Sequence, residues 1–171
     1  QLAAKIGSTP LSIYMVALSE CGLDPFRIRD DGTAASWIQF TTIGLDGLGV
    51  SLAEVKNMCY RRDIVGIMDL TDRYILRAAG TTPLPRPCDA YTAVFAPAYI
   101  GKPDDFVLYS GWDTPAYYLN APALDGFYVA DGLILQSRKM FDGKITIQDL
   151  NLSLEAKKAR LIAAHGRRYK N

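Results

Sequence analysis

The sequence predicts an α+β domain that is predominantly helical and occupies residues 1–171. Three observations support this fold class. Apolar residues recur at helical spacing in several segments of the chain. Residues 22–50 lack this pattern and combine glycines with a short run typical of strands. A length of 171 residues with a hydrophobic content of 49% suits one domain with its own core.

The first long helix is expected over residues 10–21. The segment Ser8-Thr9-Pro10 provides a hydroxyl cap and then a proline in the first turn, which is a common helix start. An apolar stripe follows at helical spacing, made by Leu11, Tyr14, Met15 and Leu18. Gly22 provides the stop. Glu20 therefore lies in the last turn of this helix.

A small β element is expected directly after this helix. Asp30-Asp31-Gly32 is typical of a turn. The run from Ser36 to Thr42 is rich in aromatic and β-branched residues and precedes three closely spaced glycines, which favours short strands and a hairpin.

Most of the remaining chain is expected to be helical. Ser51 caps a short helix through Met58, and Gly80 ends another that starts at Ile64. A proline-rich connector over residues 81–87 separates these from the later helices. Those helices are expected over residues 88–96, 103–110, 114–119 and 151–164. Residues 128–140 are ambiguous, and residues 142–146 predict a turn into a strand or helix.

Charge and cysteine content exclude several classes of protein. The net charge of +1 argues against a protein that binds nucleic acid over its whole surface. The three cysteines form no CxxC pair and are expected to be buried apolar residues, and with a single histidine they predict neither a metal site nor a cofactor. No apolar run is long enough to predict a membrane span.

Glutamate is scarce, since only three of the 18 acidic residues are Glu: Glu20, Glu54 and Glu155. Glu54 and Glu155 fall within expected surface helices, whereas Glu20 closes an amphipathic helix ahead of the β element. The position of Glu20 is therefore the one that calls for a functional explanation.

Four short segments follow one another in the order Glu20-Cys21-Gly22, Asp24-Pro25, Ser36-Trp37-Ile38-Gln39 and Ala98-Tyr99-Ile100-Gly101. Together they resemble the motifs of the lytic transglycosylases, in particular those of the virion-associated branch from bacteriophages. Glu20-Cys21-Gly22 resembles the family's Glu-Ser-Gly, and Asp24-Pro25 its Asn-Pro-like turn. Ser36-Trp37-Ile38-Gln39, followed by Phe40, resembles Gly-Leu-Met-Gln with its aromatic neighbour. Ala98-Tyr99-Ile100-Gly101 is the nearest match to Ala-Tyr-Asn-x-Gly, and Ala90-Tyr91-Thr92-Ala93 is a rival placement. The resemblance covers about residues 8–120.

The resemblance implies a lysozyme-like fold and cleavage of the MurNAc–GlcNAc β-1,4 bond of peptidoglycan with a 1,6-anhydro product. Glu20 is then the general acid and base. Gln39 and Tyr99 are expected to position Glu20 and the glycan. The other residues expected to bind substrate are Ser36, Ile38, Phe40 and Asn120.

General chemistry agrees with this role for Glu20. Cleavage of a glycosidic bond needs an acid that protonates the leaving oxygen. Apolar surroundings and the negative end of a helix dipole both favour the protonated form of a carboxyl group. Ile38 and Phe40 are candidates for such apolar walls.

Two alternatives stay open at the level of sequence. A hydrolytic muramidase on the same fold needs a second carboxylate, for which Asp30 and Asp31 are candidates. A virion protein that keeps the fold without activity is favoured by the departures from the motifs, which are Ala96, Ile100, Cys21 and Ser36.

The expected partners are peptidoglycan glycan strands and other virion proteins, and the expected location is a phage particle acting on the host periplasm and cell wall. The contact with other virion proteins is assigned to a basic C-terminal segment. Its basic residues are Lys157, Lys158, Arg160, Arg167, Arg168 and Lys170.

Overall fold

The structure is a computed structural model that describes the backbone of residues 1–168 and the side chains of residues 1–164. It mixes helices and strands, and because 54% of it is helical, the predicted α+β, predominantly helical class is confirmed. The chain divides into two compact units, Gln1–Ile100 and the part from Gly101 onward. The sequence analysis predicts one domain over residues 1–171, whereas each unit has buried side chains of its own.

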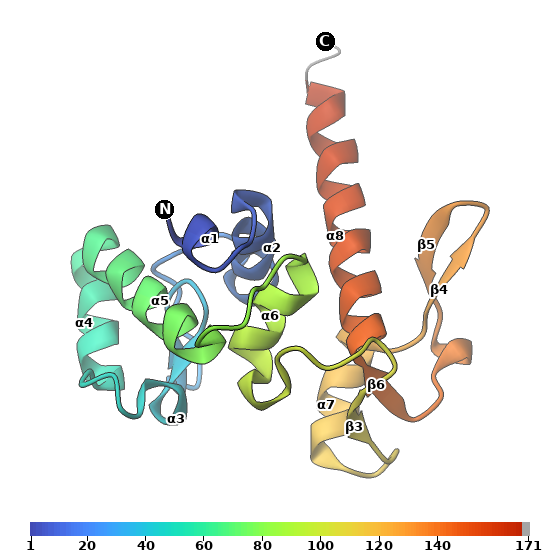
Figure 1. Cartoon of the computed structure of the whole chain (residues 1–171), viewed down its shortest axis with the longest axis horizontal. Coiled ribbons are helices and arrows are strands. Elements are labelled where there is room, and N and C mark those ends of the chain that lie inside the picture. Colours follow the sequence, from blue (N-terminus) through green and yellow to red (C-terminus); the bar gives the residue numbers. More distant parts are fainter. Residues whose placement is uncertain (169–171) are drawn as a thin grey trace. The chain divides into compact units, whose positions relative to one another are not determined.

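The first unit is built mainly from helices around one short hairpin (Figure 1). Its elements are α1 (Leu2–Lys5), α2 (Pro10–Cys21), β1 (Ala34–Ala35), β2 (Phe40–Thr41), α3 (Thr42–Leu45), α4 (Leu52–Arg61), α5 (Ile64–Ala79), α6 (Pro87–Phe95) and the 3-10 helix η1 (Pro97–Tyr99).

Helix α2 is the central helix of this unit and has the predicted boundaries. The Thr9 side chain accepts a hydrogen bond from the Ser12 amide at 3.1 Å, and Gly22 closes the helix in a left-handed conformation with a φ of 64°. Met15 and Val16 are completely buried, and α2 packs against α6. The end of α2, where Glu20 lies, is thus fixed by a cap and by the core.

The predicted β element is a two-stranded antiparallel hairpin. Ala34 pairs with Thr41 and Ala35 pairs with Phe40. The turn between the strands contains two residues with positive φ, Ser36 at 75° and Gln39 at 54°. The short helix α3 that follows is not part of the sequence prediction.

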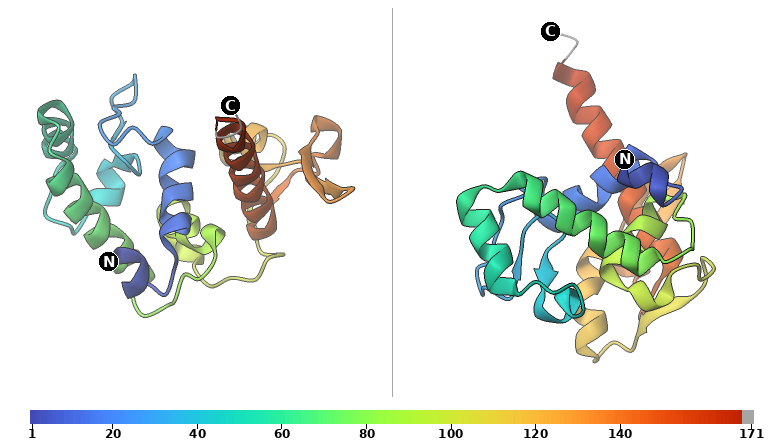
Figure 2. Two further views of the ribbon diagram at one scale, coloured as in Figure 1. Left: turned by 90° about the horizontal axis from the view of Figure 1, so that it is seen from above. Right: turned by 60° about the vertical axis from the view of Figure 1, so that its left-hand side comes forward.

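Helices α4 and α5 follow one another as an angled pair, visible in Figure 1 and again from above in Figure 2. Ser51 and Glu54 form a capping box at the start of α4. This helix continues to Arg61 instead of ending at Met58 as predicted, whereas α5 agrees with the prediction.

The second unit combines two helices with two small sheets (Figure 1). Its elements are β3 (Val107–Ser110), α7 (Pro115–Leu124), β4 (Phe127–Ala130), β5 (Leu133–Gln136), the 3-10 helix η2 (Arg138–Met140), β6 (Lys144–Thr146) and α8 (Ile147–Arg168). Strand β3 pairs with β6 and β4 pairs with β5, both antiparallel.

Several predictions for this unit are wrong. A helix was expected over residues 103–110, but residues 107–110 form strand β3, because the apolar run from Phe106 pairs with the distant strand β6. Helix α7 extends beyond the expected residues 114–119, and α8 starts before residue 151. The described part of the chain therefore has three two-stranded sheets rather than one small β element.

A buried hydrogen bond ties α7 to the loop that follows it. The Tyr117 hydroxyl donates to the Asp125 carboxylate, and both residues are 2% exposed. Leu150 and Leu154 of α8 and Ile145 of β6 fill the core beside them. The second unit thus has an apolar core with one paired carboxylate inside it.

The C-terminal basic segment is described only in part. Lys158 forms an ion pair with Glu155 at 3.1 Å, and Arg160 is exposed. Arg167, Arg168 and Lys170 lie outside the residues whose side chains are described. Within residues 1–168, every helix is too short or too polar to cross a lipid bilayer.

Candidate active site in the first unit

A hollow of about 260 Å³ lies at the end of α2 in the first unit. It receives side chains from α2, the β1–β2 hairpin and helices α5 and α6. Its lining residues are Glu20, Arg29, Ala34, Ile38, Gln39, Phe40, Thr41, Gly44, Tyr74, Val94 and Phe95. Four of the residues singled out in the sequence therefore share one site: Glu20, Ile38, Gln39 and Phe40.

Glu20 is half-buried in a hollow whose lining is apolar at Ile38 and Phe40 and polar at Arg29 and Gln39. Ile38 is 3% exposed and Phe40 is 2% exposed. The rings of Phe40 and Tyr74 pack edge to face, with their centroids 5.6 Å apart. Among the described residues that line the hollow, Glu20 is the one carboxylate.

The turn of the hairpin places Gln39 in the hollow. Its φ of 54° is unusual for a residue other than glycine, and both its backbone amide and its side-chain Nε2 donate to the Ser36 carbonyl, at 3.1 and 2.9 Å. The second of these bonds uses one of the two N–H donors of the Gln39 side-chain amide. Together the two bonds fix this amide in the hollow that Glu20 also lines.

Ser36 shapes the turn without lining the hollow. It is completely buried, and its φ of 75° is a conformation that favours glycine. The motif that residues 36–39 resemble has glycine at this position, and glycine adopts such a positive φ without strain. Ser36 supports the site through its carbonyl, which accepts from Gln39.

Besides Ser36, two further residues predicted to bind substrate lie elsewhere. Tyr99 is half-buried in η1 and is not among the described residues that line the Glu20 hollow. Asn120 belongs to the second unit, where its side chain donates to the Ala116 carbonyl at 2.8 Å within α7. Neither residue is brought to Glu20 by the first unit.

Tyr74 of α5 is a site residue that the sequence reasoning missed. Burial is the main cause that raises the pKa of Tyr74; the negative charge of Glu20 raises it further and the positive charge of Arg77 lowers it. A signal for Tyr74 existed, because it lies seven residues after buried Ile67, on the same face of the helix.

Cys21 and the acidic turn have structural roles. The Cys21 thiol, which stands where the motif that this segment resembles has serine, is buried and donates to the Ala17 carbonyl at 3.1 Å, and burial raises its pKa. Hydrogen bonds from the backbone amide and hydroxyl of Thr33, together with Arg29, lower the pKa of Asp31. Neither Asp30 nor Asp31 is among the described residues that line the hollow.

A second hollow of about 460 Å³ adjoins the first. The two share Thr41, Gly44, Tyr74 and Phe95, and the second continues to Ile43, Asp46, Arg77, Ala78 and Pro97. The first hollow by itself is smaller than the usual ligand pocket of about 300–1,000 Å³. Because the two hollows share four lining residues, they form one longer groove.

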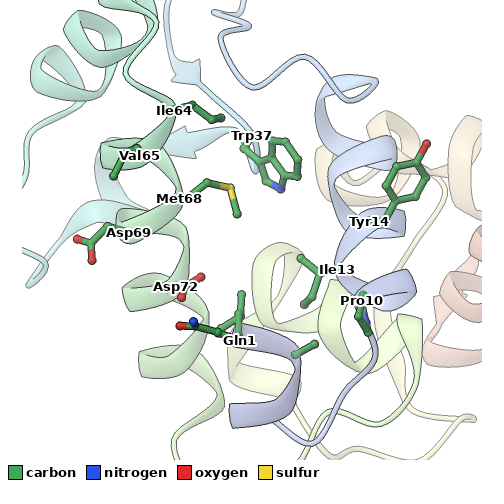
Figure 3. A pocket seen from close by; sticks show the side chains of 12 residues that line it. Gln1, Pro10, Ile13, Tyr14, Trp37, Ile64, Val65, Met68, Asp69 and Asp72 are labelled. Atoms are coloured by element: carbon green, nitrogen blue, oxygen red, sulfur yellow. The ribbon is translucent and has the colours of Figure 1, made fainter.

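A third hollow, of about 640 Å³, is apolar and lies between α1, α2 and α5 (Figure 3). Trp37, Ile13 and Met68 point into it in Figure 3. Trp37 therefore lines this hollow, while its neighbours Ile38 and Gln39 line the one that contains Glu20.

Within the described residues, no three His, Cys, Asp or Glu side chains gather as a metal site would need. Comparisons of the chain with protein-family models, with curated proteins and with solved structures gave no match. The lysozyme-like fold and the transglycosylase activity therefore stay predictions.

Proposed function

We propose that the protein is a peptidoglycan lytic transglycosylase that cleaves the MurNAc–GlcNAc β-1,4 bond, with Glu20 as acid and base. The observation that carries the proposal is that Glu20, the one carboxylate among the described lining residues, shares a hollow of mixed polar and apolar lining with Gln39. A hollow with a single acid suits a reaction that needs proton transfer but no second carboxylate.

In this mechanism Glu20 first donates its proton to the glycosidic oxygen, and the bond from that oxygen to the anomeric carbon breaks. The C6 hydroxyl of the same sugar then attacks the anomeric carbon. The Glu20 carboxylate takes the hydroxyl proton, which regenerates the acid and leaves a 1,6-anhydro ring. Gln39 is suited to hold a sugar acetamido group or the Glu20 carboxyl, since both are hydrogen-bonding partners of an amide.

The biological setting follows from the same resemblance and belongs to the proposal. The protein acts from a phage particle and opens the host cell wall locally during DNA entry. The exposed Arg160 and its basic neighbours Lys157 and Lys158 are the described part of the segment proposed to contact other virion proteins.

The test is cell-wall cleavage by Glu20→Gln, with Glu54→Gln as the matched control. Glu54 lies in a capping box, a motif that tolerates glutamine, so the control makes the same chemical change away from the hollow. Glu20→Gln should lose cleavage at least about a hundredfold, in line with loss of a general acid, while Glu54→Gln keeps it. Wild-type activity in Glu20→Gln would refute the assignment.

Mass spectrometry of the released fragments separates the proposal from its rivals. Anhydro ends are expected. Reducing ends would instead identify a hydrolytic muramidase. Folded wild-type protein that releases no fragments from purified cell wall would identify a non-enzymatic virion protein.

A further inference from the structure

The hollow next to the Glu20 site contains a guanidinium group that acid–base cleavage of a sugar chain does not need. We propose that Arg77 binds a carboxylate of the peptidoglycan stem peptide, so that the enzyme selects peptide-bearing glycan over uncharged amino-sugar polymers. This inference rests on the proposed function, and it adds to it a second subsite and a basis for specificity.

Arg77 is placed beside the catalytic hollow by the pitch of one helix. It follows Tyr74 by three residues on α5, so the two side chains emerge about one turn apart. Tyr74 lines both hollows, and the charges of Glu20 and Arg77 both act on its hydroxyl. A ligand bound at Glu20 can therefore reach Arg77 without leaving the groove.

The Arg77 guanidinium is held in place by the loop after α3. Its Nη1 donates to the Asp46 carbonyl. It also packs so closely on Gly47 that a Cβ there would lie 2.6 Å from Nη2 and 2.7 Å from Nη1. Gly47 has a φ of 70°, so both its conformation and the close approach require glycine. A guanidinium fixed in this way loses less entropy when it binds a ligand.

The donors and the walls of this hollow fit a peptide that ends in a carboxylate. A guanidinium has five N–H donors in a fork that matches a carboxylate, and the bond to Asp46 uses only part of them. Ala78, Phe95 and Pro97 provide apolar surface for short alkyl side chains. The Asp46 side chain also lines the hollow. It and Arg77 are both exposed, so solvent screens both charges, and it is the fixed fork of donors that distinguishes Arg77 as a carboxylate ligand.

The test measures binding rather than cleavage, with the full chain carrying Glu20→Gln so that no ligand is consumed. Isothermal titration uses three soluble oligosaccharides of equal length: glycan with stem peptides, glycan stripped to its lactyl groups, and chitin oligosaccharide. Adding Arg77→Gln should weaken binding of the peptide-bearing glycan about tenfold, as expected for loss of a charge-assisted hydrogen bond. Binding of the other two should change less than about twofold.

Arg73→Gln is the matched control. Arg73 lies on the same helix and anchors the same loop, since its Nη2 donates to the Leu48 carbonyl, but it is not among the described residues that line either hollow. It should leave all three affinities unchanged. An equal loss in Arg73→Gln would show that the loop, not the carboxylate contact, is responsible. Arg77→Lys keeps the charge without the fork and should lie between Arg77→Gln and the parent.

The outcomes separate the two proposals. If the parent Glu20→Gln protein binds all three ligands equally, or if Arg77→Gln weakens the stripped glycan as much as the peptide-bearing one, the stem-peptide inference is wrong while the glycan site stands. If the parent binds none of the three, the proposed function itself fails.

Discussion

The hairpin residue Ser36 shows how one backbone conformation supports a site without touching it. Its φ of 75° costs a residue with a Cβ about 1 kcal/mol or more relative to glycine. Its carbonyl nevertheless receives both bonds from Gln39. The strained residue Ser36 is thus hydrogen-bonded to Gln39, the residue proposed to position the substrate.

Ser36→Gly should therefore raise the free energy of unfolding, by about 0.5–1 kcal/mol once the greater freedom of glycine in the unfolded chain is included. Urea denaturation followed by circular dichroism measures the change. Ser36→Ala is the control, since alanine keeps the Cβ and its strain. A glycine variant that is no more stable than the alanine variant would disprove the strain at this position.

Tyr74 and Gln39 differ in how readily the sequence predicts that they line the hollow. Gln39 was predicted as a site residue, because it matches the glutamine of a short motif both in position and in residue type. Tyr74 reaches the hollow from α5, a helix that follows the hairpin by more than twenty residues. Its ring meets Phe40 only after the two elements have packed together.

At the scale of the element, the end of α2 is a local property of the sequence. Gly22 has a φ of 64° and open space around the position where a Cβ would stand. An alanine there would meet no neighbour, so its cost is conformational only.

Gly22→Ala should accordingly lower the free energy of unfolding by about 1 kcal/mol. Gly22→Asn should lose less, because asparagine tolerates the left-handed region better. Thermal denaturation of the two variants against the parent measures both changes. Equal losses in the two variants would mean that the left-handed cap is not what closes the helix.

The elements of the second unit were harder to predict because their pairing is non-local. Residues 107–110 form strand β3 by pairing with β6, which lies more than thirty residues further along the chain. The β4–β5 hairpin, in contrast, carried a local signal that was not used. Its turn is Asp131-Gly132, both residues have positive φ, and Asp-Gly is a preferred pair for a two-residue hairpin turn.

At the scale of the whole molecule, the interiors of the two compact units differ in their polar content. The first is apolar around α2, whereas the second encloses the Tyr117–Asp125 hydrogen bond. Burial, followed by the hydrogen bond and the charge of Asp125, raises the pKa of Tyr117 from 10.0 to about 12. The stability of the molecule therefore depends on pH in the alkaline range.

The folded protein keeps the Tyr117 proton between pH 10 and about 12, where the unfolded chain releases it. The folded state then binds more protons, so this contribution is complete below pH 10 and is lost as the pH rises through about 12. Denaturant titrations at a series of pH values should show a steeper alkaline loss for the parent than for Tyr117→Phe. Parallel curves would contradict the raised pKa.

The sequence by itself determined α2 with its caps and the hairpin after it, because both depend on contacts between residues close in the chain. It grouped Glu20, Ile38, Gln39 and Phe40 as candidates through a motif resemblance, and the packing of α2 on the hairpin decided that they share one hollow. Tertiary structure decided that Tyr74 and Phe95 complete the hollow, that Tyr99 stays outside it, and that Arg77 stands beside it on Gly47. Those results require helices from separate parts of the chain to pack on one hairpin, and the residue pattern of each helix specifies its buried face but not its neighbour.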